Sequence, residues 1–283
     1  PTWDVVIDVD ALAATEGENW HWAGVDVIAP EFTRALVEFT RGGGDTTVVR
    51  EFDMETRQFV SDGFMLPEAK HDVSWLDEDT LLVGTDFGDG SLTTSGYPRV
   101  LRRWRRGTAR EDAETVFEGE ASDVAVGAQV SREPGFERTF IYRIVDFFNK
   151  ETYELRGGEL IRLDIPTDCS MATHRQWAMM MLLSEFDHAG RSYPAGSVLV
   201  TQYDDLLAGN AEFQPVFEPG GGDFLAMGTF TGEVFLSIKL RDVATVVEVV
   251  TPGTWEAVPL PGVPENTNTT LAGLDPFGDE IFL

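Results

Sequence analysis

The sequence predicts an all-β fold, a β-propeller of four-stranded blades, and three observations support this prediction. Short runs rich in β-branched and aromatic residues recur along the chain, with glycine, proline, aspartate and asparagine between them. The turns of successive hairpins are spaced roughly 50 residues apart, which is the period of propeller blades. Helical periodicity is almost absent. We expect about five blades, and a single propeller domain over residues 1–283.

The first blade is expected within residues 1–60. Residues 3–9 and 20–28 alternate between apolar and polar side chains and are β-branched, so both runs are predicted strands. Three further strands are expected around the glycine-rich turn that precedes Val48, at residues 34–40, 48–52 and 57–60.

Residues 73–120 repeat the pattern most clearly. A strand pair is expected around Trp75 and Leu81, and a glycine-rich loop follows at residues 88–96. Two more strands are expected at residues 99–104 and 114–117. This stretch therefore predicts one complete four-stranded blade.

Three further copies of the pattern complete the chain. Two runs fit a helix or a strand. For residues 179–186 periodicity cannot separate the two structures. For residues 242–249 we predict a strand, because β-branched residues dominate the run. The strands expected in these copies are residues 139–147, 152–156 and 159–165, then 176–183, 197–203 and 213–217, then 233–240, 245–250 and 255–260.

The last residues, 271–283, are predicted to begin a new pair of strands. A blade that holds only its first strands leaves backbone groups unpaired at an exposed edge. We therefore expect an incomplete propeller that belongs to a longer protein.

Composition narrows the function classes. Forty-nine acidic residues against 21 basic ones give a net charge of −28, which repels the phosphates of nucleic acids and anionic lipid surfaces. We therefore expect no nucleic-acid or membrane partner. No apolar run is long enough to span a bilayer, and no signal peptide is evident, so a cytoplasmic location is expected.

We expect no catalytic residue in this chain. Cys169 is the only cysteine, so no internal disulfide can form, and His174, the nearest base in the sequence, follows it within a predicted loop region. No serine has the Gly-x-Ser-x-Gly context of a hydrolase nucleophile, because Ser95 lies in a turn and Ser197 starts a strand.

No metal or cofactor site is expected either. The four histidines, His21, His71, His174 and His188, lack the spacing of zinc ligands. The acidic runs at residues 77–79 and 86–90 lack the spaced ligands of a calcium loop, so they are interpreted as turns.

An arginine-rich strand surrounds Trp104. Alternation places Arg103 and Arg105 on one face and Arg102, Trp104 and Arg106 on the other. Because the chain is so acidic, we expect these arginines to form ion pairs within the propeller. A minority interpretation is a five-bladed glycosidase, in which two of the strand-flanking carboxylates Asp4, Asp8, Asp72 and Asp146 would meet in the channel.

Four segments resemble the propeller of the prolyl oligopeptidase family. They read WLDEDTLLV at residues 75–83, YPRV at 97–100, WRRGT at 104–108 and ETVFE at 114–118. WDVVIDVDALA at residues 3–13 and the glycine turn before Val48 are similar to the lead into that family's first blade. The resemblance spans the chain and is most specific over residues 3–120.

The resemblance implies a seven-bladed, non-catalytic propeller that covers an α/β-hydrolase domain carrying a Ser, Asp, His triad. Such a propeller admits short peptides and excludes folded proteins. The expected partners are therefore the chain's own hydrolase domain, which lies outside this sequence, and short peptide substrates. A stand-alone interaction propeller is the alternative from another class.

Overall fold

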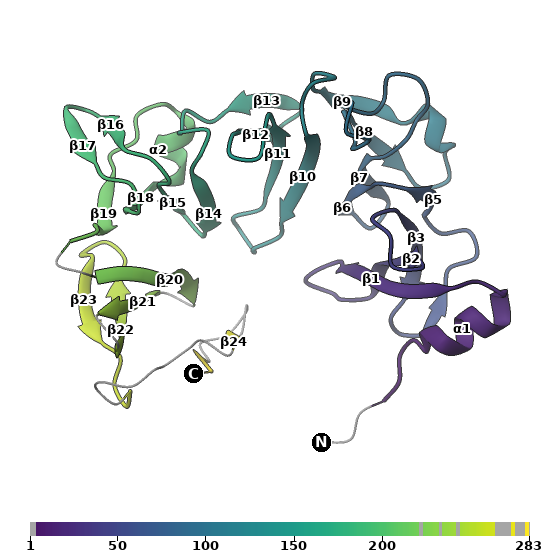
Figure 1. Cartoon of the computed structure of the whole chain (residues 1–283), viewed down its shortest axis with the longest axis horizontal. Coiled ribbons are helices and arrows are strands. Elements are labelled where there is room, and N and C mark those ends of the chain that lie inside the picture. Colours follow the sequence, from purple (N-terminus) through teal and green to yellow (C-terminus); the bar gives the residue numbers. More distant parts are fainter. Residues whose placement is uncertain are drawn as a thin grey trace. The chain divides into compact units, whose positions relative to one another are not determined.

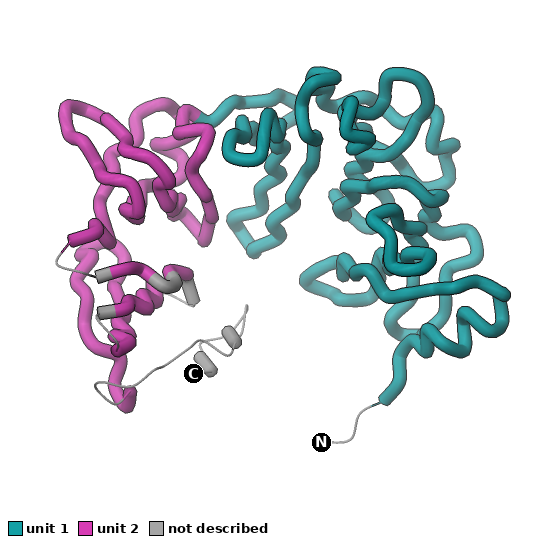
Figure 2. The backbone as a smooth tube through the Cα atoms, viewed as in Figure 1, with its two compact units in different colours: residues 1–163 teal, residues 164–283 magenta. Residues whose placement is uncertain are grey.

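The computed structural model describes residues 4–220, 223–231, 234–241, 244–263, 273–274 and 281–282 (Figure 1). The chain forms two compact units, residues 1–163 and 164–283 (Figure 2). Both are built from antiparallel four-stranded sheets, which we call blades and number in chain order. The predicted all-β architecture of four-stranded blades is confirmed, whereas the prediction of a single domain stays a prediction.

The strand predicted at residues 3–9 is wrong. The described part of this run, residues 4–9, holds no strand, and its last residue begins helix α1 (Val9–Glu16). The Asp8 carboxylate caps this helix by accepting a 2.9 Å hydrogen bond from the N–H of Ala11. Gly17 ends the helix in the left-handed conformation, with φ of 71°. The capping residues therefore favour a helix from Val9 onward, although the alternation of apolar and polar residues predicted a strand.

Blade 1 consists of β1 (Trp20–Val27), β2 (Arg34–Arg41), β3 (Thr47–Asp53) and a divided fourth strand. Both β4 (Gln58–Phe59) and β5 (Met65–Ala69) pair with β3. The residues between them leave the ladder opposite Glu51, whose backbone pairs with Val60 and Phe64 instead. The sequence did not predict β5.

Blades 2 and 3 complete the first unit. Blade 2 orders β6 (Asp72–Asp77), β7 (Thr80–Gly84), β8 (Val100–Arg105) and β9 (Glu114–Glu118), with a short 3-10 helix, η1 (Arg110–Asp112), before β9. Blade 3 orders β10 (Ala125–Ser131), β11 (Arg138–Ile144), β12 (Lys150–Arg156) and β13 (Glu159–Arg162). The predicted strand at 139–147 stops at Ile144, because a hairpin turn follows.

The second unit holds blades 4 and 5. Blade 4 orders β14 (Ser170–His174), β15 (Trp177–Met181), β18 (Val198–Gln202) and β19 (Gln214–Phe217). It also carries the hairpin β16 (Phe186–His188) and β17 (Arg191–Tyr193), and helix α2 (Tyr203–Leu207). Blade 5 orders β20 (Asp223–Thr231), β21 (Val234–Arg241), β22 (Ala244–Thr251) and β23 (Glu256–Pro259).

The two ambiguous runs are resolved as strands. β15 covers the start of residues 179–186, and β22 covers the described part of residues 242–249. The pair predicted near the last residues is found as β24 (Gly273–Leu274) and β25 (Ile281–Phe282); the rest of residues 271–283 lies outside the described residues. No helix in the described part of the chain is long and apolar enough to cross a membrane.

Neighbouring blades pack through apolar cores. Leu81 and Val83 of β7 pack with Leu36, Val49 and other blade 1 residues, whereas Leu82 packs with Val126 and Ile141 of blade 3. In the second unit, Val198 and Phe217 of blade 4 pack with Phe235 and Val250 of blade 5. Because strand side chains alternate, both faces of a blade are buried.

Leu82→Ala tests this packing. Leu82 is fully buried, so the variant should lower the free energy of unfolding by about 2 to 5 kcal/mol. Urea unfolding followed by tryptophan fluorescence measures the change. The control, Leu160→Ala, alters an exposed residue of blade 3 and should cost less than about 0.5 kcal/mol. Equal effects of the two variants would contradict the proposed core.

Candidate functional site

The residues considered as nucleophiles are held in structural positions. Cys169 is buried in an apolar cluster with Met180, Leu182 and Leu199. Ser197 is completely buried, and the backbone oxygen of Ser95 accepts a hydrogen bond from Lys70. These surroundings suit packing and turn formation.

The histidines are likewise part of the local fold. His71 Nε2 lies 2.9 Å from the carbonyl oxygens of both Thr47 and Pro67, so this nitrogen donates its proton. Burial lowers the pKa of His71. His188 donates in the same way to the carbonyl of Ala211 at 2.9 Å. Within the described ranges, no three His, Cys, Asp or Glu side chains are grouped to hold a metal ion.

The acidic runs form turns, as predicted. Asp77 Oδ1 accepts the N–H of Asp79 at 2.8 Å, and Asp86 Oδ1 accepts the N–H of Gly88 at 2.8 Å. Both are Asx turns, in which a carboxylate replaces a backbone acceptor.

The four carboxylates of the glycosidase interpretation have separate local roles. Asp8 caps α1, Asp4 pairs with Arg57 at 3.6 Å, and Asp146 accepts backbone N–H groups in a hairpin turn. Asp72 is half-buried, and the other three are exposed. This arrangement gives the glycosidase interpretation no support.

Asp72 joins blade 2 to blade 3. Its Oδ1 accepts a 2.8 Å hydrogen bond from the N–H of Ala128 on β10. A Cβ at Gly127 would lie 2.4 Å from Oδ2, so only glycine allows this approach. Burial raises the pKa of Asp72 to about 6, and the nearby Glu38 carboxylate contributes to the rise. Burial, with a smaller effect of Asp72, raises the pKa of Tyr142 to about 12.

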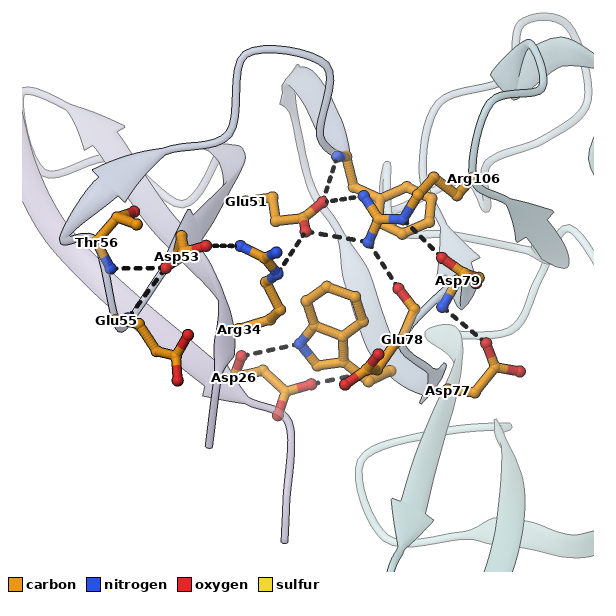
Figure 3. A network of polar contacts seen from close by, with 12 residues as sticks. Asp26, Arg34, Glu51, Asp53, Glu55, Thr56, Asp77, Glu78, Asp79 and Arg106 are labelled. Atoms are coloured by element: carbon orange, nitrogen blue, oxygen red, sulfur yellow. Dashed lines mark hydrogen bonds and ion pairs between the residues drawn. The ribbon is translucent and has the colours of Figure 1, made fainter. Parts of the chain in front are cut away.

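Glu51 joins blade 1 to blade 2 through an ion pair whose carboxylate is fully buried (Figure 3). This carboxylate accepts two hydrogen bonds from Arg106, at 2.8 and 3.0 Å. It also accepts the backbone N–H of Phe64 at 2.8 Å. The Arg106 guanidinium lies 4.6 Å from the Phe64 ring centroid, and its pKa is raised, chiefly by Glu51.

The predicted ion pairing of the arginine strand is confirmed for two of its residues. Arg106 binds Glu51 and also Asp79, at 2.9 Å, and Arg103 pairs with Glu114 at 3.4 Å. Arg102 lies over the Phe87 ring at 4.3 Å. The predicted faces are therefore right, although the partner Glu51 is far away in the sequence.

A third link between blades lies near the ends of β1, β6 and β10, which are the first strands of blades 1, 2 and 3. The indole N–H of Trp75 donates to the Asp26 carbonyl at 3.1 Å, and Arg132 donates to the Trp75 carbonyl. Burial raises the pKa of Asp26, against the hydrogen bond from Trp75 and the charge of Arg132. Burial also lowers the pKa of Arg132, while Asp26, Asp77 and Glu31 oppose this shift. The three residues connect blades 1, 2 and 3.

A cleft of about 630 Å³ opens at this end of the first unit. The β1–β2 loop, the β6–β7 turn, the β10–β11 loop and the β12–β13 turn all contribute to its walls. Charged residues of both signs line it, among them Glu31, Asp77, Arg132, Glu137 and Arg156. Such a lining suits a polar ligand that carries both charges. Ser131 and Thr139 contribute hydroxyl groups to the cleft, and no histidine that could activate them is among its described lining residues.

The stacked four-stranded blades, held by polar links, define a β-propeller domain whose candidate site is a binding surface. The family model described as "Prolyl oligopeptidase, N-terminal beta-propeller domain" matches residues 1–142. The chain therefore belongs to the prolyl oligopeptidase family, as the resemblance of its blade sequences predicted.

Relatives extend the likeness over the rest of the chain. Peptidase y4nA of Sinorhizobium fredii (strain NBRC 101917 / NGR234) is 31% identical over 100% of this chain, and peptidase RP174 of Rickettsia prowazekii (strain Madrid E) is 28% identical over 87%. The chain spans only 40% and 37% of these proteins. The structure of a post-proline cleaving enzyme from Rickettsia typhi matches 92% of this chain and 40% of its own, with a TM-score of 0.83 and 24% identity, so it shows the fold alone.

Glu51→Gln should destabilise the first unit. The change removes one of the two carboxylate charges that pair with Arg106, and losing a hydrogen bond between charged groups costs about 1.5 to 3 kcal/mol. Urea unfolding measures the loss. Glu114→Gln is the control, because Glu114 is exposed, and it should cost no more than about 1 kcal/mol. Similar losses for both would show that the Glu51 pair does not hold the blades together.

Asp72→Asn should change how stability depends on pH. A folded-state pKa of about 6 lies above the ordinary value, so the folded state binds more protons and ionisation of Asp72 destabilises it. The stability contribution of protonated Asp72 is present at low pH and is lost as the pH rises through about 6. Because asparagine does not ionise, the variant does not lose stability in this way as the pH rises.

Unfolding of both proteins between pH 4.5 and 8 measures the effect. The variant should gain stability relative to the natural protein as the pH rises, and the difference should level off above the pKa. Asp146→Asn, an exposed turn residue, serves as the control for a general pH effect. A difference that is independent of pH would contradict the raised pKa.

Proposed function

We propose that this chain is the gating and substrate-selecting propeller of a serine peptidase that hydrolyses short peptides. The observation that carries the proposal is the match of residues 1–142 to the N-terminal propeller of prolyl oligopeptidase. It is supported by the full-length alignment to a longer peptidase. In this proposal the propeller admits peptides, excludes folded proteins and performs no bond cleavage itself.

The links between blades support a gate that selects by size. A barrier made of stacked sheets excludes folded proteins only while the sheets stay together. The Glu51–Arg106 pair and the Asp72–Ala128 hydrogen bond oppose separation of blades 1, 2 and 3, in addition to the apolar cores. The cleft beside Arg132 offers groups of both charges to the termini or side chains of a passing peptide.

Catalysis is assigned in this proposal to an α/β-hydrolase domain outside this sequence. Hydrolysis by a Ser, His, Asp triad requires no metal or cofactor, and it requires an accessible serine beside a histidine. In the described part of the chain, Ser197 is buried, and His71 and His188 bond to backbone carbonyl groups. A cytoplasmic location belongs to the same proposal.

Activity assays test this division of labour. Purified chain 1–283 should not hydrolyse a chromogenic prolyl peptide, because the proposed nucleophile lies elsewhere. The full-length gene product should hydrolyse it and lose activity with a serine-directed covalent inhibitor. It should also leave a folded protein substrate intact. Turnover by chain 1–283 that the same inhibitor abolishes would contradict the non-catalytic role.

A further inference from the structure

Two phenylalanines form an unusually exposed tip on blade 3. Phe147 and Phe148 lie in the turn between β11 and β12, and 90% and 76% of their surfaces are exposed. Two adjacent aromatic rings in water are unfavourable unless something covers them. Neither ring belongs to an apolar core of the first unit.

The turn that carries the rings is well defined. Asp146 Oδ1 accepts the backbone N–H groups of Phe148 and Asn149, each at 2.8 Å, and the side-chain amide of Asn149 at 3.0 Å. The N–H of Val145 donates to the Asn149 carbonyl at 2.9 Å. These hydrogen bonds lower the pKa of Asp146, with that of Phe148 the largest cause. A preorganised turn loses little conformational freedom on binding.

The topology of the blade indicates what lies near this tip. The strand order β10-β11-β12-β13 is antiparallel throughout, so the chain enters and leaves the blade at one end. The N–H of Val124, just before β10, donates to Ile144, just before the tip. The N–H of Leu163, just after β13, donates to Thr152, just after the tip. Entry, exit and tip therefore share one end.

The same rule applies to every four-stranded up-and-down blade of a propeller. In a propeller built of such blades, a segment that follows the last blade emerges at the end that carries the turns between the second and third strands, and the turn with Phe147 and Phe148 is of this kind. In the longer peptidases that this chain resembles, about three fifths of the sequence lies outside the matched region. That remainder is the natural neighbour of the tip.

We propose that Phe147 and Phe148 form a docking anchor that inserts into an apolar pocket of the catalytic part following the propeller. The inference rests on the proposed function. A net charge of −28 disfavours the two other occupants, a second copy of this chain and an anionic membrane. Adjacent aromatic residues on a fixed turn are typical anchors of protein interfaces.

Thiol labelling tests the anchor. Cys169 is buried, so a thiol introduced by Phe147→Cys is the accessible one. It should react rapidly with an alkylating reagent in chain 1–283 and roughly tenfold or more slowly in the full-length protein, because the docked tip is covered. Leu160→Cys is the control. Leu160 lies in β13 next to the Gly157–Gly158 turn, at the opposite end of blade 3, and should react equally in both proteins.

A second variant, Phe147→Ser with Phe148→Ser, keeps the test valid if one cysteine variant folds poorly. It should leave the unfolding midpoint of chain 1–283 unchanged and increase limited proteolysis between the propeller and the remainder of the full-length protein. Leu160→Ser should change neither. Equal proteolysis of the double variant and the natural protein would overturn the anchor.

Three labelling results would also overturn the proposal. They are equal labelling at position 147 in both proteins, protection that grows with the concentration of chain 1–283 alone, and protection by anionic phosphatidylserine vesicles. Hydrolysis of the prolyl peptide is measured on the same full-length sample. An active protein with an unprotected tip refutes the anchor alone, whereas a protected tip in an inactive protein supports docking and refutes the peptidase function.

Discussion

Burial of both faces of blade 2 is the constraint on which the rest of the first unit depends. β7 shows it most clearly, because all five of its residues are buried. Leu81 and Val83 face blade 1, while Leu82 faces blade 3. A shift of one residue in its pairing would exchange the two faces. Blade 2 therefore needs both of its neighbours for stability, and blades 1 to 3 form one compact unit.

A polar side chain that is buried between two blades needs a hydrogen-bond partner. When the partner lies on the neighbouring blade, the pair links the two blades. Glu51 would be costly to bury alone, yet Arg106 of the next blade and the Phe64 N–H satisfy it. Its side chain occupies the break between β4 and β5, and a Cβ at Gly63 would lie 2.8 Å from Oε2. The interruption in the fourth strand is therefore the structural consequence of placing a carboxylate there.

The sequence predicted strands where apolar residues form short runs, as in β2, β3 and β7. It missed β10 and β14, whose small and polar residues carry little intrinsic preference and take their conformation from the pairing strand. It misassigned residues 3–9 because the helix cap of Asp8 acts over three residues and no periodicity reveals it. The faces of the arginine strand followed from alternation alone.

The candidate site was less predictable than the fold, because its contacts join distant residues. Glu51 and Arg106 are 55 positions apart, and Asp72 and Ala128 are 56 apart. Asp72 was recognised as one of four candidate carboxylates, but its raised pKa depends on burial that only the assembled blades produce. The sequence predicted that a strand at residues 139–147 includes Phe147, whereas the structure places Phe147 in the turn after β11.

The two ends of blade 3 differ chemically, and this difference bears on how a gate could operate. The end with the β10–β11 loop and the β12–β13 turn borders the charged cleft, whereas the opposite end carries the chain entry, the chain exit and the aromatic tip. If the catalytic part docks at the aromatic end, the charged end faces solvent and meets peptides first. Peptides would then contact Arg132 and its carboxylate neighbours before they reach the catalytic part. In this arrangement, the residues that select peptides by charge and the residues that anchor the catalytic part lie at opposite ends of blade 3, so the two roles use different residues.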